Sequence, residues 1–198
     1  NVPKFKYKDL RIIDFAFYNL QYVNVRSDGG TKDWDWVPTQ LDECISMSDA
    51  FRAIGYVSAN SSQKESFPQL ITSNKLRNVS GCFNFGPLSW KDKDGNLTRV
   101  PWTDTSGVTN FSVAFANSSI TEIGPFDTGN GQNFESMFQN CASLTGIPNY
   151  NFSSATNFNK AFKDCASLGS WFSGAVLSSV ETFEETWSGC TSLTTFPA

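Results

Sequence analysis

The sequence predicts an α/β repeat fold, a solenoid of about seven units of 23–25 residues with one short helix and one short strand in each unit. Three observations predict it. An apolar string recurs at a fixed interval near the C-terminus, its columns continue upstream, and the extra residues of longer units fall at one point of the unit. We expect one domain over residues 1–198, with units carrying inserts in 1–99 and regular units in 100–198.

The repeat is clearest near the C-terminus. The string Phe134–Leu144 recurs as Phe158–Leu168 and again as Phe183–Leu193. Its pattern is F-x-x-x-F-x-x-C-x-x-L, with Trp in place of the second Phe in the last copy, and an apolar-proline pair such as Ile147-Pro148 follows. A fixed period of this length is typical of a solenoid, because each unit can bury its apolar face only against its neighbours.

The same columns can be followed to the N-terminal half. The first-column residues are Ile13, Met47, Val79, Phe111, Phe134, Phe158 and Phe183. Their steps are 34, 32, 32, 23, 24 and 25 residues. The three long steps contain inserts at Asn24–Trp36, Ser58–Ser66 and Ser89–Arg99, and subtracting the extra 11, 7 and 9 residues leaves steps of 23, 25 and 23.

Local chemistry suggests how each unit folds. The two aromatic columns and the cysteine column are spaced i, i+4 and i+7, which is one face of a helix of about two turns. Asn110, Asn133 and Asn157 precede the first aromatic residue and are the residue type expected at an N-cap. The Leu-x-x-Ile-Pro segment that follows predicts a short strand or an extended corner.

The strings N-F-x-x-x-F-x-x-C-x-S-L-x-x-I-P resemble the BspA-type leucine-rich repeat family, in the variety found in mycoplasma-type surface lipoproteins. The resemblance extends over Val100–Ala198 and, less closely, over Cys44–Leu88. It implies a right-handed leucine-rich-repeat-like solenoid, exposure outside a cell and a role in adhesion or protein recognition. Related repeats in virion proteins imply an alternative, a structural component of a virion or surface assembly.

Composition excludes several function classes. The chain has no histidine, which removes Ser-His-Asp and Cys-His catalysis and most zinc sites, so we expect no enzyme and no cofactor. A net charge of −4 without basic clusters argues against nucleic acid as a partner. No apolar run is long enough for a membrane span, so we expect no membrane insertion.

The cysteines allow two interpretations. Cys141, Cys165 and Cys190 share a column, which favours buried thiols packed beside the aromatic residues over a metal site. Ser118 in the same column supports the packing interpretation. A disulfide between Cys44 and Cys82 remains open.

The inserts are the candidate contact surface. Equivalent points of a solenoid stack, so three inserts at one point should lie on one face. The candidate ligand-binding residues in or beside them are Trp34, Trp36, Trp90, Trp102, Asp92 and Asp94. Exposed tryptophans suit a binding hot spot, but they would also suit a cap on the end of the stack. The two aspartates suggest a hairpin turn more than a calcium loop.

We therefore expect a non-catalytic recognition or adhesion module in an extracellular, cell-surface or virion setting. Its expected partner is a protein or a glycan on a cell surface, bound through the inserts. In the alternative, the partners are neighbouring subunits of an assembly.

Overall fold

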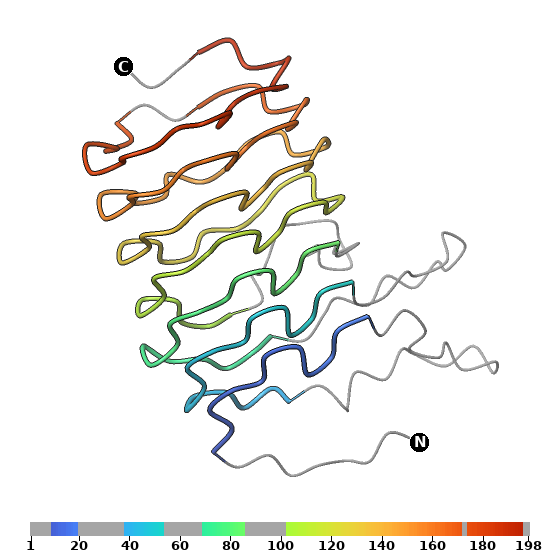
Figure 1. Ribbon diagram of the computed structural model, residues 1–198, viewed down its shortest axis with the longest axis vertical. Helices are drawn as coiled ribbons and strands as arrows, with labels where there is room; N and C mark the ends of the chain where they lie inside the picture. Colours follow the sequence, from blue (N-terminus) through green and yellow to red (C-terminus); the bar gives the residue numbers. More distant parts are fainter. Residues whose placement is uncertain (1–8, 20–37, 54–68, 86–101, 172–173, 196–198) are drawn as a thin grey trace, which may run out of the picture.

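The computed structural model describes residues 9–19, 38–53, 69–85, 102–171 and 174–195. Their backbone forms a stack of flat coils that runs from the N-terminal end at the bottom of Figure 1 to the C-terminal end at the top. The predicted unit of one short helix and one short strand is wrong. The described residues contain no helix, and therefore none that could span a membrane, and their extended pairing consists of eight isolated parallel bridges.

The bridges connect equivalent residues of successive coils. One row of bridges joins the residue before each first-column position: Ile12, Ser46, Asn78, Asn110, Asn133, Asn157 and Thr182. The structure thus pairs the columns in the register in which the sequence aligns them. We number the coils 1 to 7 in this order and call this row the asparagine column.

Backbone hydrogen bonds explain why the apolar string is not a helix. In coil 5, every second N–H donates to a carbonyl of coil 6 at 2.8–2.9 Å, and these donors are Phe134, Ser136, Phe138 and Asn140. The intervening N–H groups donate three residues back within the coil, and these are Met137, Gln139 and Cys141. A helix would direct all of them four residues back. The string is instead a series of tight turns. The N–H groups that the turns do not use donate to the next coil, so every N–H of 136–141 is hydrogen-bonded.

Two positions per coil adopt positive φ, which a helix does not allow. Val113 and Asn117 have φ of 59° and 57°, and Ser136 and Asn140 have 55° and 59°. The equivalent positions in the other coils are Phe15, Asn19, Asp49, Ala53, Gly81, Phe85, Lys160, Asp164, Glu185 and Gly189. Left-handed backbone is costly for most residues, so the stacking interactions must outweigh the strain at positions such as Val113.

The asparagines predicted as N-caps make the expected hydrogen bond, but no helix follows. The Oδ1 atoms of Asn110, Asn133 and Asn157 each accept the backbone N–H two residues later at 3.0 Å. This is an Asx turn, in which the side chain satisfies a backbone donor that the coil itself leaves unpaired.

The two aromatic columns form the core. The second column stacks face to face with centroid separations of 5.3–6.1 Å and interplanar angles of 7–20°, through Phe17, Phe51, Phe83, Phe115, Phe138 and Phe162. In the first column, Phe111 and Phe134 stack at 6°, whereas Phe158 and Phe183 are tilted by 53°. Burial of each ring contributes about 1.5–3 kcal/mol, so this core is the main source of stability.

Candidate functional site

Most of the predicted contact residues lie outside the described residues: Trp34, Trp36, Trp90, Asp92 and Asp94. Trp102 is described, and its side chain is only 1% exposed. Its ring packs against Phe83 and Phe115, and its Nε1–H donates to the Met47 sulfur at 3.1 Å. Trp102 therefore belongs to the core and presents no surface to a ligand.

A different group of exposed side chains gathers on coils 1 to 3. We call it the aromatic–arginine cluster, and it consists of Phe15, Tyr18, Asp49, Arg52 and Phe85. The three rings are 59%, 45% and 51% exposed. Three large rings exposed side by side, in contact with an arginine, are the usual composition of a binding surface rather than of a solvated face.

Arg52 holds the cluster together. Its guanidinium carbon lies 5.4 Å from the centre of the Tyr18 ring and 5.8 Å from the centre of the Phe85 ring. Its Nη1 is 3.2 Å from Oδ1 of Asp49, and Phe15 contacts Tyr18 edge to face at 6.2 Å. Cation–π contacts at exposed sites are worth about 0.5–1 kcal/mol each, which favours this arrangement of the rings over others.

The repeat explains how these residues come together. Tyr18 and Arg52 directly follow two residues of the second aromatic column, Phe17 and Phe51, and so occupy equivalent positions in adjacent coils. Phe51 is buried and Phe17 is partly buried. Phe85 occupies the next outward column, where later coils carry Asn117, Asn140, Asp164 and Gly189. Sequence reasoning missed the cluster, although aromatic residues in columns that are mostly polar in the other coils were a detectable signal.

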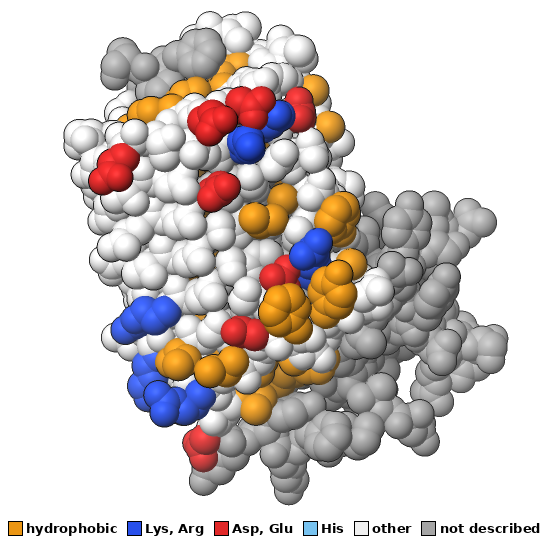
Figure 2. All heavy atoms as spheres, in the orientation of Figure 1, with side chains coloured by type: hydrophobic (Ala, Val, Ile, Leu, Met, Phe, Trp, Pro, Cys, Tyr) orange, Lys and Arg blue, Asp and Glu red, His pale blue; other side chains and the backbone are white. Residues whose placement is uncertain are grey.

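The surface agrees with this placement. On the face drawn in Figure 2, exposed hydrophobic side chains gather among charged ones over the lower, N-terminal coils. Further hydrophobic side chains lie beside charged ones near the top of the described stack. Apolar surface with interspersed charges thus occurs at both ends of this face.

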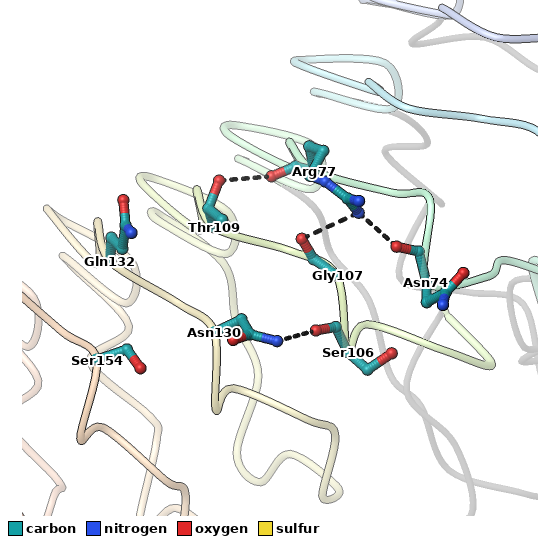
Figure 3. A pocket seen from close by; sticks show the side chains of 8 residues that line it. All are labelled: Asn74, Arg77, Ser106, Gly107, Thr109, Asn130, Gln132 and Ser154. Atoms are coloured by element: carbon teal, nitrogen blue, oxygen red, sulfur yellow. Dashed lines mark hydrogen bonds between the residues drawn. The ribbon is translucent and has the colours of Figure 1, made fainter.

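A second feature is a polar groove of about 480 Å³ that runs across coils 3 to 6 (Figure 3). Its lining residues are Asn74, Arg77, Ser106, Gly107, Thr109, Asn130, Gln132 and Ser154. Much of its hydrogen-bonding capacity is already used between coils. Nη1 of Arg77 donates to the carbonyls of Asn74 and Gly107, and Nδ2 of Asn130 donates to the Ser106 carbonyl at 2.6 Å. These contacts make the groove primarily a means of tying coils together.

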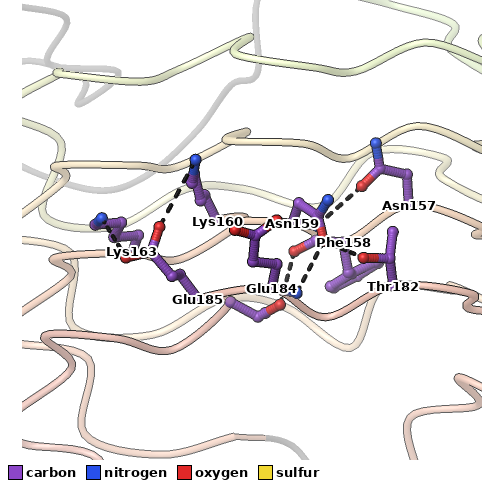
Figure 4. A network of polar contacts seen from close by, with 9 residues as sticks. Asn157, Phe158, Asn159, Lys160, Lys163, Thr182, Glu184 and Glu185 are labelled. Atoms are coloured by element: carbon purple, nitrogen blue, oxygen red, sulfur yellow. Dashed lines mark hydrogen bonds and ion pairs between the residues drawn. The ribbon is translucent and has the colours of Figure 1, made fainter.

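A third feature is a network of charged and amide side chains on coils 6 and 7 (Figure 4). Nζ of Lys163 donates to Glu185 at 2.7 Å, and Lys160 lies 3.7 Å from the same carboxylate. The hydrogen bond raises the pKa of Lys163 and lowers the pKa of Glu185. Exposed pairs of this kind contribute little to stability, and nothing in the network resembles a catalytic arrangement.

The cysteines are free thiols, so the disulfide left open between Cys44 and Cys82 does not form. In the cysteine column, Sγ of Cys141 and of Cys165 each donate at 3.1 Å to the carbonyl of a second-column Phe in the preceding coil. Burial raises the pKa of Cys44 and of Cys141 to about 11. No group of three or more metal-ligating side chains occurs among the described residues.

Comparison with known families gives a match over the C-terminal part of the chain. The model of a family described as "Mycoplasma protein of unknown function, DUF285" matches residues 89–196, more than half of the chain. The chain belongs to the DUF285 family. No curated protein and no solved structure matches the chain.

The DUF285 match does not include the residues of the aromatic–arginine cluster. It begins at residue 89 and therefore covers coils 4 to 7, whereas the aromatic–arginine cluster lies on coils 1 to 3. The matched residues thus include coils 4 to 7 and the insert Ser89–Arg99, and the cluster lies outside them.

Proposed function

We propose that the chain is a non-catalytic recognition module, displayed on a cell or virion surface, that binds a protein partner through the aromatic–arginine cluster. The observation that carries the proposal is the position of Arg52, held between the exposed rings of Tyr18 and Phe85. Tyrosine, arginine and other large side chains that are ordered before binding dominate the affinity of protein interfaces, because little side-chain entropy is lost on association.

The chemistry of the cluster favours a protein over a glycan. Phe15 and Phe85 offer exposed apolar rings without a polar group, and the one charged donor, Arg52, already shares its Nη1 with Asp49. A sugar site would need several free hydrogen-bonding groups beside its stacking ring. A partner with an apolar side chain to place against the rings fits better.

The inserts would extend this surface. In coils 1 to 3, Tyr18, Arg52 and Phe85 precede the inserts that begin at Asn24, Ser58 and Ser89 by only a few residues each. We therefore propose Trp34, Trp36, Trp90, Asp92 and Asp94, which lie outside the described residues, as further contact residues.

The absence of catalysis is also a proposal. It rests on a sequence without histidine and on thiols that make poor nucleophiles, because burial raises their pKa. A relation to BspA-type surface proteins rests on the repeated N-F-x-x-x-F-x-x-C strings, and it favours the surface location.

A protein array tests the proposal. The labelled chain is screened against purified extracellular and surface proteins, and the affinity for each ligand found is measured by surface plasmon resonance. We expect Tyr18→Ser combined with Phe85→Ser to weaken binding at least about a hundredfold, the effect of losing two hot-spot rings. The matched control is Val176→Ser, which changes an exposed apolar residue elsewhere and should leave binding unchanged. Equal affinities of the two variants, or the absence of any protein ligand, would contradict the proposal.

A further inference from the structure

Besides tying coils together, the polar groove across coils 3 to 6 presents two rows of side chains (Figure 3). One row stands two residues before the first aromatic position of successive coils and contains Arg77, Thr109 and Gln132. The other row contains Asn74, Ser106, Asn130 and Ser154. Because successive coils lie one strand spacing apart, the groove offers similar polar groups at regular intervals along the stack.

Gly107 creates the hollow between the two rows. In its column the adjacent coils carry Lys75 and Asn130, whereas coil 4 has no side chain at this point. A Cβ atom at Gly107 would collide with the carbonyl oxygen of Asn74 and with Nη1 of Arg77. The glycine therefore leaves room for the Arg77 guanidinium, whose Nη1 donates to the Gly107 carbonyl at 3.3 Å.

The bonds that hold Arg77 leave one edge of its guanidinium unused. Nη1 donates to the carbonyls of Asn74, Leu76 and Gly107. Nε and Nη2, which share one edge, make no hydrogen bond with the described residues. Two parallel N–H groups of a guanidinium bind both oxygens of an oxyanion, so this edge suits a carboxylate or a sulfate. Among the described residues that line the groove, Arg77 is the one charged side chain.

Other polar groups of the groove are unused as well. Within the described residues, no hydrogen bond involves the side-chain amides of Asn74 and Gln132 or the hydroxyl of Ser106. Amides and hydroxyls both donate and accept hydrogen bonds, which matches the hydroxyl groups of sugars. The described lining contains no apolar side chain, so the apolar side chain of a peptide would find no matching surface there.

We propose that this groove binds an acidic oligosaccharide, with the carboxylate or sulfate of one sugar on Arg77 and the hydroxyls of the next sugars on Ser106 and Gln132. A linear saccharide presents similar groups from sugar to sugar, as the groove does from coil to coil. Its described lining has no aromatic ring for stacking, so one site should be weak, with a Kd of about 0.1–1 mM. The site is separate from the aromatic–arginine cluster and goes beyond the proposed function.

Titration of the isotope-labelled full chain, followed by nuclear magnetic resonance, tests the proposal. The acidic probes are a hyaluronan tetrasaccharide, which carries carboxylates, and a chondroitin sulfate tetrasaccharide, which also carries sulfates. A cellulose tetrasaccharide is the neutral probe. We expect an acidic probe to shift the backbone signals of Ser106 and Gly107 and to bind at least about tenfold more tightly than the neutral probe. Binding of both acidic probes identifies a carboxylate as the bound group, and binding of chondroitin sulfate alone identifies a sulfate.

Variants locate the site. Arg77→Gln should weaken binding of the acidic probe at least about tenfold. The matched control is Lys75→Gln, which removes the same charge from an exposed neighbour that pairs with Glu43 outside the groove lining, and it should change the affinity less than about twofold. Because Arg77 also ties coil 3 to Gly107, Gln132→Ala gives a second test. Its amide makes no hydrogen bond within the described residues, so this variant should fold and weaken binding about threefold.

Several results would overturn the proposal. They are groove signals that no acidic probe shifts, equal affinities for acidic and neutral probes, and an equal loss of affinity in Arg77→Gln and Lys75→Gln. Unchanged affinity in both Arg77→Gln and Gln132→Ala would overturn it as well. So would inorganic sulfate or a tetra-aspartate peptide that binds as tightly as the saccharides, since the groove would then select an anion and not a sugar. None of these results depends on protein binding by the Tyr18 and Phe85 variant.

Discussion

The amide oxygen of Asn133 accepts a hydrogen bond from the backbone N–H of Glu135 at 3.0 Å, two residues further along the chain. Without this bond the Glu135 N–H would have no acceptor, because it donates neither to a carbonyl of its own coil nor to one of the next coil. The same contact recurs at Asn78, Asn110 and Asn157, so the asparagine column is a repeated structural device rather than a surface feature.

Replacing Asn133 tests this role. We expect Asn133→Ala to lower the free energy of unfolding by about 1 kcal/mol, because a backbone donor loses its acceptor. Asn133→Asp keeps an acceptor oxygen and should be closer to the unmodified chain. Urea denaturation measures both, and an equal loss in the two variants would argue against the Asx turn.

The second aromatic column should dominate stability. Phe138 is fully buried between Phe115 and Phe162, so Phe138→Ala should cost about 3–5 kcal/mol. Phe85→Ala removes an equally large ring that is 51% exposed and should cost about 1 kcal/mol or less. Thermal and urea unfolding compare the two, and similar costs would contradict the assignment of core and surface.

The left-handed positions predict a stabilising substitution. Val113 is β-branched and has a φ of 59°, whereas asparagine adopts this conformation with less strain. We expect Val113→Asn to raise the free energy of unfolding by about 0.5–1 kcal/mol. Ser112→Asn changes the neighbouring residue, which has no positive φ, and should not stabilise the chain. If Val113→Asn destabilises as Ser112→Asn does, the backbone assignment is wrong.

Buried thiols make stability fall at high pH. Burial raises the pKa of the Cys141 thiol from its ordinary value of 9.0 to about 11 in the folded chain. Between these values the unfolded state loses a proton that the folded state retains, so its contribution to stability is present below pH 9 and lost as pH rises toward 11. The loss is about 2 kcal/mol for this thiol.

Cys141→Ser isolates this contribution, since serine does not ionise in that range and Ser118 already occupies the same column in coil 4. The difference in unfolding free energy between the unmodified chain and Cys141→Ser should change by about 2 kcal/mol between about pH 8 and pH 11 in reductant. A pH-independent difference would contradict the burial of this thiol.

The repeat register was predictable from the sequence, but the conformation of the unit was not. Spacing of i, i+4 and i+7 marks a helical face, yet it also fits tight turns whose residues point inward at the same intervals. Whether the string forms a helix or a series of turns depends on where N–H groups such as that of Phe138 donate. They donate to carbonyls of the next coil rather than to carbonyls of their own coil. That pairing is a property of the stack, and no single unit reveals it.

One local signal did favour turns. The residue before each cysteine of the cysteine column is Asn140, Asp164 or Gly189, and these are the residue types that most readily adopt positive φ. Such residues are poor choices for the middle of a helix. The cluster residues were missed for the same reason, because the outward direction of Tyr18 follows from the turn geometry.

The most direct test of this structure is a nuclear Overhauser spectrum of the labelled chain in solution. The stack of turns predicts a contact between the amide proton of Phe134 and the backbone of Asn157, across two coils whose atoms are joined by a 2.9 Å hydrogen bond. It also predicts no series of helical contacts between residues four apart along 134–141, because the bonds within the coil run only three residues back. Helical contacts along this segment, without the contact between Phe134 and Asn157, would contradict the stacked-turn architecture on which the proposed binding surface depends.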